Sequence, residues 1–235
     1  MSSNKPTLAV IGGTGNLGLA LARRWVKAGY PVAIGSRDAA KAAHAAETLT
    51  AETGLAVGSG TNRSVAEQAE IVVVTVPFAS QAGVLTDIRP VVAGKLVIDA
   101  TVPLVPPKVA RVQLPPEGSA AQIAQRLLGD GVTLVSAFHN VAAHRLATDD
   151  EIDCDVLVFG DVKEARARTV ALADAAGLRG IQAGPLANAA AAEALTSVLI
   201  FINKTYRVDG AGIRITGAFA ATRDLSRHTM IAPCP

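Results

Sequence analysis

The sequence predicts an α/β protein with a doubly wound parallel sheet and a small C-terminal α/β domain. Short apolar runs alternate with longer segments of helical periodicity, which is typical of strands joined by crossover helices. The run 70–76 is rich in β-branched residues, as expected of a strand covered on both faces. A glycine-rich turn joins the first apolar run, 8–11, to the first helical segment, so the sheet is expected to be of the Rossmann type.

Each expected element has its own signal. In the segment 16–29, Leu17, Leu21 and Trp25 recur at helical spacing and Gly29 is a natural stop. The segment 103–118 holds five of the twelve prolines, which predicts an ordered loop. The expected strands are 8–11, 31–35, 55–57, 70–76, 95–99, 133–137 and 155–160, and the expected helices are 16–29, 38–52, 64–69, 119–128, 162–176 and 191–204, with one more between 76 and 95.

Composition excludes several classes of protein. The chain has 235 residues, of which 50% are apolar and 18% are charged, so it is not a disordered chain. A net charge of +2 and eight aromatic residues argue against a strongly basic or base-stacking nucleic-acid binder. The longest apolar runs, 71–79 and 198–202, fall short of the ~20 residues that span a bilayer, so no membrane segment is expected. Two cysteines and a polar, short N-terminus predict a cytoplasmic protein without disulfides.

A G-x-G-x-x-G turn follows the first expected strand and opens the first expected helix. The alternative is a glycine-rich turn without a ligand, but this strand-turn-helix context favours a dinucleotide site. Gly13 would permit the tight turn, Gly15 would let a pyrophosphate approach the backbone, and Gly18 would let the helix pack closely on the sheet. The free N–H groups at the helix start would hold the phosphates. The predicted phosphate-binding residues are Gly13, Thr14, Gly15, Asn16, Leu17 and Gly18.

The end of the second strand predicts NADP rather than NAD. An NAD-binding protein usually has Asp or Glu there, to bind the ribose 2′-OH. This strand ends in Gly35, Ser36 and Arg37, and a hydroxyl with a guanidinium suits a 2′-phosphate. Lys41, four residues after Arg37, can face the same site. The alternative is that Arg37 is an ordinary exposed residue and Asp38 is the ribose acid, but Asp38 is better placed to cap the following helix.

The second substrate should lie beyond the carboxyl ends of the other strands. These ends carry Thr75, Val76 and Pro77, then Ala100, Val102 and Pro103, then His139, and Asp99 is the one acid at a strand tip. His139 is the histidine best placed as a general acid, and the alternative is a buried structural histidine or one that only hydrogen-bonds a cofactor. These residues also suit reactions that need little acid–base catalysis, such as hydride exchange between two carriers. His44, His144 and His228 have no support from nearby thiols or carboxylates, so no metal is expected.

With these residues, the chain resembles the NADPH-dependent coenzyme F420 reductases (F420:NADP oxidoreductases) over about 8–217. Each segment is short, and it is their order and spacing that make the resemblance specific. The segments are 11–18 (IGGTGNLG), 35–37, 75–77, 101–104 (TVPL), 119–121, 137–140 (AFHN), 184–188 (GPLAN) and 193–196 (EALT).

The resemblance implies reversible hydride transfer between NADPH and the deazaflavin F420, small-molecule substrates and a homodimer. It assigns residues 14–17 and 36–37 to NADP, and Val102, Pro103, His139, Val141 and Ala143 to the deazaflavin pocket, with Asn188 and Leu195 as further members. The acidic tail of F420 should prefer cations at the rim of the site. The candidates are Lys108, Arg111, Arg145 and Arg207, each of which is also explained as an ordinary solvated charge.

The expected organisation is therefore an NADP-binding Rossmann domain over 1–150, a small C-terminal domain over 151–218 that contributes to the F420 cleft and the dimer, and a tail of unassigned role over 219–235. Two alternatives stay open. One is an NADPH-dependent reductase of another small acceptor (an imine, a 2-oxoacid or a ferric chelate). The other is a non-catalytic NADPH-binding regulatory module.

Overall fold

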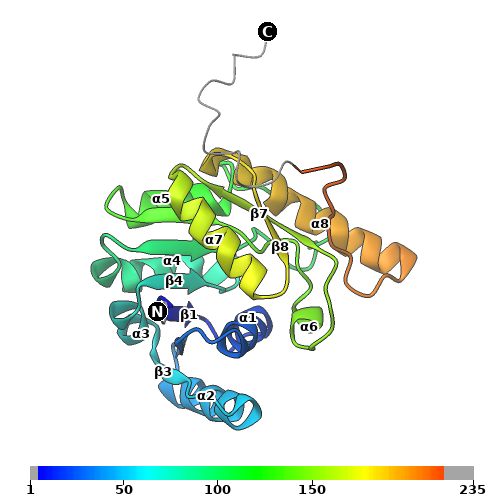
Figure 1. Ribbon diagram of the computed structural model, residues 1–235. Helices are drawn as coiled ribbons and strands as arrows, with labels where there is room; N and C mark the ends of the chain where they lie inside the picture. Colours follow the sequence, from blue (N-terminus) through cyan, green and yellow to red (C-terminus); the bar gives the residue numbers. More distant parts are fainter. Residues whose placement is uncertain (1–4, 220–235) are drawn as a thin grey trace.

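The computed structural model describes residues 5–219, which form one eight-stranded sheet covered by helices on both faces (Figure 1). The strand order is β3-β2-β1-β4-β5-β6-β7-β8. All neighbouring strands are parallel except β6 and β7, which are antiparallel. The predicted doubly wound sheet is therefore confirmed, with one reversal near its C-terminal edge. The strands are β1 Leu8–Ile11, β2 Val32–Ser36, β3 Gly58–Thr61, β4 Ile71–Val74, β5 Leu96–Asp99, β6 Thr133–Ser136, β7 Asp155–Gly160 and β8 Arg179–Gln182.

The helices divide between the two faces of the sheet. Side chains of α1, α2, α6 and α7 share one apolar cluster, and those of α3, α4, α5 and α8 share the other. The helices are α1 Asn16–Lys27, α2 Ala39–Thr53, α3 Asn62–Gln68, α4 Phe78–Ile88, α5 Ala120–Leu128, α6 Ala143–Leu146, α7 Lys163–Ala175 and α8 Ala189–Tyr206, with 3-10 turns η1 Arg89–Val91 and η2 Leu186–Asn188.

One local prediction was wrong, and two short elements were not predicted. The third strand was expected at 55–57, but Leu55 is exposed and the strand is β3, whose sequence is Gly-Ser-Gly-Thr. An edge strand of this composition has no apolar alternation that sequence reasoning could detect. The short helix α6 and the strand β8 were not predicted, because four residues give too little periodicity.

Register places four strand ends at one edge of the sheet. Ile11 pairs with Val74, Val74 with Asp99, and Asp99 with Ser136. The segments that follow β1, β4, β5 and β6 therefore leave the sheet side by side, as the prediction of a site at this edge requires.

The proposed boundary at residue 150 stays a prediction. Strands β7 and β8, which come after residue 150, extend the same sheet. Side chains of α1, which comes before residue 150, contact residues after it. Arg24 donates to the carbonyl oxygen of Leu146 at 3.0 Å and to that of Ala176 at 3.3 Å. Of the expected tail, residues 220–235 lie outside the described part of the chain.

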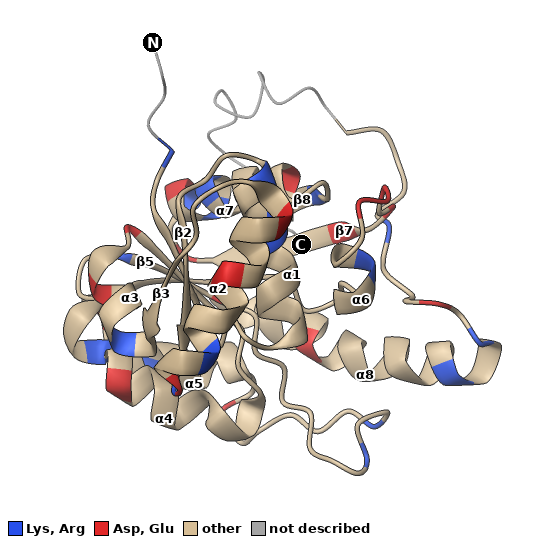
Figure 2. Cartoon of the chain, turned by 90° about the horizontal axis from the view of Figure 1, so that it is seen from below, with Lys and Arg blue, Asp and Glu red and all other residues tan. Residues whose placement is uncertain are grey.

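The helix α8 corrects the expectation that no segment reaches membrane-spanning length. Together with η2 it forms the helical stretch Leu186–Tyr206, which by length and composition alone is apolar enough to cross a bilayer. One third of its most apolar 18-residue window is buried in the protein, and the buried residues of α8 include Glu193. Its C-terminal half projects from the body and carries few charges (Figure 2).

Candidate functional site

The glycine-rich turn has the geometry of a phosphate cradle, with one change from the prediction. The left-handed backbone of the tight turn is at Gly12, where φ is +72°, and not at Gly13. Gly13 is needed for space, because a Cβ there would lie 2.7 Å from the carbonyl oxygen of Val10. A Cβ at Gly18 would lie 2.4 Å from Thr75 Oγ1, which confirms the predicted close packing of helix and sheet. No side chain caps α1 at Gly15, so its first N–H groups remain available to an anion.

A cavity of about 170 Å³ joins this turn to the end of β2. Seven residues predicted for cofactor binding line it: Thr14, Gly15, Ser36, Arg37, Thr75, Val76 and Pro77. Arg37 is exposed and forms no ion pair with any residue between 5 and 219. The cavity therefore offers a free guanidinium, a hydroxyl and backbone N–H groups to a phosphorylated ligand.

Asn62 also lines this cavity, and sequence reasoning missed it. Its Oδ1 accepts a hydrogen bond from the Gly12 backbone N–H at 3.3 Å. A Cβ at Gly35 would come within 3.0 Å of this oxygen, so the glycine before Ser36 makes room for the contact. Nothing in the sequence marks an asparagine at the start of a helix as the partner of a turn fifty residues earlier.

The side chain of Asp38 caps α2. Its Oδ1 accepts hydrogen bonds from the backbone N–H of Ala40 at 3.0 Å and of Lys41 at 3.2 Å. This supports the capping alternative over a ribose-binding role. Lys41 is exposed in the first turn of α2 and does not line the cavity.

His139 is buried where β6 ends. Its Nε2 lies 2.8 Å from Ser136 Oγ. Burial lowers the pKa of His139 to about 4, so the imidazole is neutral near pH 7. The preceding residue, Phe138, has a φ of +67°, an uncommon conformation for a bulky residue that cannot be read from sequence. A neutral, hydrogen-bonded His139 suits a positioning role better than that of a charged acid.

The turn after β6 is tied to α8. Thr196 Oγ1 donates to the carbonyl oxygen of His139 at 3.1 Å, and Asn140 Nδ2 donates to the carbonyl oxygen of Ala192 at 3.0 Å. The N-terminal half of α8 is thus brought to the same sheet edge as the cavity. Residues 193–196, which resemble a family segment, lie in this half of α8.

The other residues predicted for the acceptor side differ in their surroundings. Pro103 and Ala100 are buried, Val102, Val141 and Leu195 are half-buried, and Asn188 is exposed with its Nδ2 3.4 Å from the carbonyl oxygen of Ala183.

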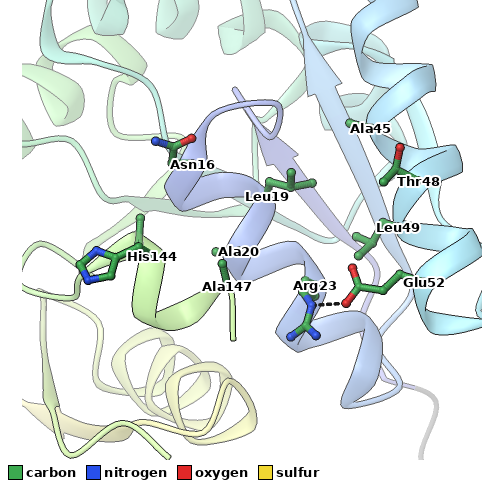
Figure 3. A pocket seen from close by; sticks show the side chains of 11 residues that line it. Asn16, Leu19, Ala20, Arg23, Ala45, Thr48, Leu49, Glu52, His144 and Ala147 are labelled. Carbon is green, nitrogen blue, oxygen red and sulfur yellow. Dashed lines mark hydrogen bonds and ion pairs between the residues drawn. The ribbon is translucent and has the colours of Figure 1, made fainter. Parts of the chain in front are cut away.

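Ala143 and Asn16 line a separate cavity of about 470 Å³ between α1, α2 and α6 (Figure 3). Of the four candidate cations, Lys108, Arg111 and Arg207 are exposed, and Arg145 lies 3.7 Å from the carboxylate of Asp209. Among residues 5–219, no group of three or more His, Cys, Asp or Glu side chains could hold a metal ion.

Comparisons with known proteins identify similar reductases. The family model described as "NADP oxidoreductase coenzyme F420-dependent" matches residues 7–103. An F420-dependent NADP reductase of Methanothermobacter thermautotrophicus is 43% identical over 218 residues, covering 89% of this chain and 94% of the relative. The enzyme of the same name from Methanocaldococcus jannaschii is 34% identical over 89% of this chain and 97% of its own length. The crystal structure of a proposed F420-dependent NADP-reductase from Arthrobacter sp. FB24 superposes with a TM-score of 0.75 at 25% identity, covering 89% of this chain and 99% of that one.

Proposed function

The chain belongs to the family of coenzyme F420-dependent NADP oxidoreductases, and on this premise we propose that the carboxyl edge of its sheet holds NADPH and F420 face to face. The protein is an oxidoreductase that transfers a hydride between NADPH and F420. One observation carries this conclusion. The similarity to the named reductases extends over 89% of the chain, and so includes the acceptor-side segments after residue 103 as well as the dinucleotide turn.

On the NADP side, this chain's own groups fit the ligand. The uncapped start of α1 and the Cβ-free face of Gly15 suit a pyrophosphate, and the free Arg37 with Ser36 suits a 2′-phosphate. Lys41 adds positive charge at the start of α2. We assign the residues that follow β4 and β5 to the part of NADPH that extends from its phosphates towards the acceptor. These residues are Thr75, Val76, Pro77 and Ala100.

On the acceptor side, the groups are mostly apolar or neutral. Val102, Pro103, Val141 and Leu195 exclude water, and neutral His139 orients the acceptor by hydrogen bonding. When the two carriers are bound, the hydride moves between nicotinamide C4 and deazaflavin C5. A transfer between two carbon centres needs held geometry more than a proton shuttle, because orientation alone can supply several kcal/mol of the barrier. Ala143 and Asn188 are assigned to this side from the family resemblance.

We further propose that the enzyme is a cytoplasmic homodimer. The exposed face of α8 carries Val198, Phe201 and Tyr206, of which Phe201 is 56% exposed. A row of large apolar side chains on a projecting helix is typical of a subunit interface. The buried free thiol of Cys154 suits a reducing compartment.

The decisive test mixes the purified protein with NADPH and oxidised F420 and follows the deazaflavin absorbance. We expect loss of the F420 absorbance with NADPH and a much slower reaction with NADH. FMN in place of F420 is the control for a general flavin reductase. Turnover of an imine, a 2-oxoacid or a ferric chelate without F420 turnover would favour the other reductase class, and NADPH binding without any turnover would favour a regulatory module.

A further inference from the structure

One chain of hydrogen bonds connects two buried carboxyl groups, Asp99 at the end of β5 and Glu193 on α8. Gln81 Nε2 donates to Asp99 Oδ2 at 2.6 Å and to the carbonyl oxygen of Ala120 at 3.1 Å. The N–H groups of Ala120 and Ala121 donate to the two carboxylate oxygens of Glu193, at 2.7 and 3.0 Å. Asp99, Gln81 and Glu193 are each 1% exposed. The chain thus joins β5, α4, the start of α5 and α8 in the interior.

Both ends of this chain reach the acceptor side. Asp99 Oδ1 accepts the backbone N–H of Thr101 at 3.0 Å, which fixes the turn that begins the acceptor loop, residues 101–104. Glu193 lies three residues before Thr196, which binds the carbonyl oxygen of His139. A displacement of either carboxyl group would therefore also move the residues that we assign to the acceptor pocket.

The environment of the pair favours the protonated form. Burial raises the pKa of Asp99. Burial and the charge of Asp99 raise the pKa of Glu193 to about 7, although two backbone N–H groups oppose the shift. Within the described residues, Asp99 is the only charged group that shifts Glu193 in this way. The other charges on the adjoining segments are exposed or half-buried: Asp87, Arg89, Lys108, Arg111, Glu117 and Arg126. His139, on the turn bonded to α8, is neutral near pH 7 because burial lowers its pKa to about 4.

One buried hydrogen-bond acceptor beside the two carboxyl groups has no hydrogen-bond donor. Gln81 Oε1 is buried and receives no hydrogen bond from any residue that the structure describes. Two ionised carboxylates contribute acceptors alone, whereas a cluster with one carboxyl proton contains a donor. Placing two negative charges in this interior would also cost several kcal/mol.

We propose that Glu193 is a positioning residue for the hydride acceptor, and that one carboxyl proton held within this cluster, on Glu193 or on Asp99, keeps the acceptor loop in its binding position near neutral pH. This inference rests on the proposed function. Loss of the proton leaves two buried negative charges, which separate α8 and α5 from β5 and admit water. F420 affinity therefore falls as the pH rises through about 7. NADPH affinity is set mainly at the α1 turn and at Arg37, which make no bond to these hydrogen-bonded groups, so it changes less with pH than F420 affinity, although Ala100 directly follows Asp99.

The experiment measures the dissociation constants of F420 and NADPH between about pH 5.5 and 8.5, together with the infrared carboxyl band of the ligand-free protein. In the wild type we expect F420 affinity to fall at least about fivefold over this range, NADPH affinity to change less than about twofold, and the carboxyl band to titrate near pH 7. Glu193→Gln removes the charge, so its F420 affinity should not depend on pH and the band should be absent. Its NH2 group cannot accept the second backbone N–H, so its affinity at every pH should lie between those of the wild type at low pH and of Glu193→Ala. Glu193→Ala should bind F420 weakly at every pH. Glu164→Gln, an exposed carboxylate on α7, is the matched control and should behave as the wild type.

A wild-type F420 affinity that does not depend on pH, or an unchanged pH dependence in Glu193→Gln, would overturn the proposal. Asp99→Asn gives a second test if Glu193→Gln fails to fold: removing the like charge should move the transition to lower pH, and an unmoved transition would overturn the coupling of the two carboxyl groups. Absence of F420 binding at every pH would overturn the proposed function and this role with it. Binding without pH dependence would overturn this role alone.

Discussion

The indole Nε1 of Trp25, on α1, donates a hydrogen bond of 2.8 Å to the carbonyl oxygen of Leu172, on α7. Both residues are buried, and the ring of Trp25 also meets that of Phe138 edge to face, with centroids 5.9 Å apart. The first crossover helix is thus attached directly to the C-terminal part of the chain. The residues before and after position 150 share one core, so they should unfold together.

The first prediction tests this coupling. Trp25→Phe removes the hydrogen bond and part of the ring, and we expect it to lower the free energy of unfolding by about 1–3 kcal/mol in a single transition. Urea unfolding followed by circular dichroism and by limited proteolysis of 151–218 gives the measurement. Two separate transitions, or no loss of stability, would contradict the shared core.

The second prediction concerns the 2′-phosphate. Arg37→Ala removes the unpaired guanidinium that lines the cavity at the end of β2. Charge-assisted hydrogen bonds are worth about 1.5–3 kcal/mol, so the dissociation constant of NADPH should rise about 10- to 150-fold, with that of NADH unchanged. Titration calorimetry with both nucleotides measures this. Arg168→Ala, an exposed arginine on α7, is the matched control. Equal losses for the two nucleotides would remove Arg37 from the phosphate site.

These two sites differ in how far sequence could predict them. The α1 turn and the Ser36–Arg37 pair follow from local order, because a strand, a turn and a helix are adjacent in the chain. The contacts of Asn62 with Gly12, and of Glu193 with Ala120, join residues 50 and 73 positions apart. Only the packing of helices on the sheet creates such pairs, so no local sequence pattern predicts them. Similarly, the glycine motif is recognisable in the sequence, but the left-handed residue is Gly12, just before it, where a Cβ would also lie 2.6 Å from Val76 Cγ1.

The third prediction concerns acid stability. Burial opposes the ionisation of Asp155, but hydrogen bonds from Arg179 and from the Ile215 N–H outweigh it and lower the pKa of Asp155. A depressed pKa stabilises the fold above the unfolded value of about 3.9, and this contribution is lost as the pH falls through the lower folded value. Asp155→Asn should therefore lower stability at pH 7 by about 1–3 kcal/mol. The difference from the wild type should shrink below about pH 3, in urea unfolding at several pH values. A difference independent of pH would show that the charge of Asp155 is not the cause.

The fourth prediction concerns His139. Because burial lowers its pKa to about 4, the imidazole should not change charge between about pH 5.5 and 8. Nitrogen-15 NMR of the histidine side chains should show that the ring of His139 stays neutral over this range. A His139 that gains a proton near pH 6.5 would restore it as a candidate general acid.

The last prediction tests the subunit interface on α8. Phe201 and Val198 are exposed on one projecting helix, whereas buried residues of α8 face inward: Glu193 bonds to the start of α5 and Ser197 bonds to the proline-rich loop. If these exposed side chains pack against a second copy, Phe201→Asp combined with Val198→Asp places two charges in an apolar contact, which costs several kcal/mol per buried charge. Analytical ultracentrifugation should then find a dimer in the wild type and a monomer in the double variant. Ala171→Asp, an exposed position on α7, is the control for a new surface charge and should remain dimeric. A monomeric wild type would refute the dimer, and a dimeric double variant would show that the interface lies away from α8.

Since the N-terminal half of the same helix binds the turn at His139, a weakened dimer should also raise the KM for F420 more than that for NADPH.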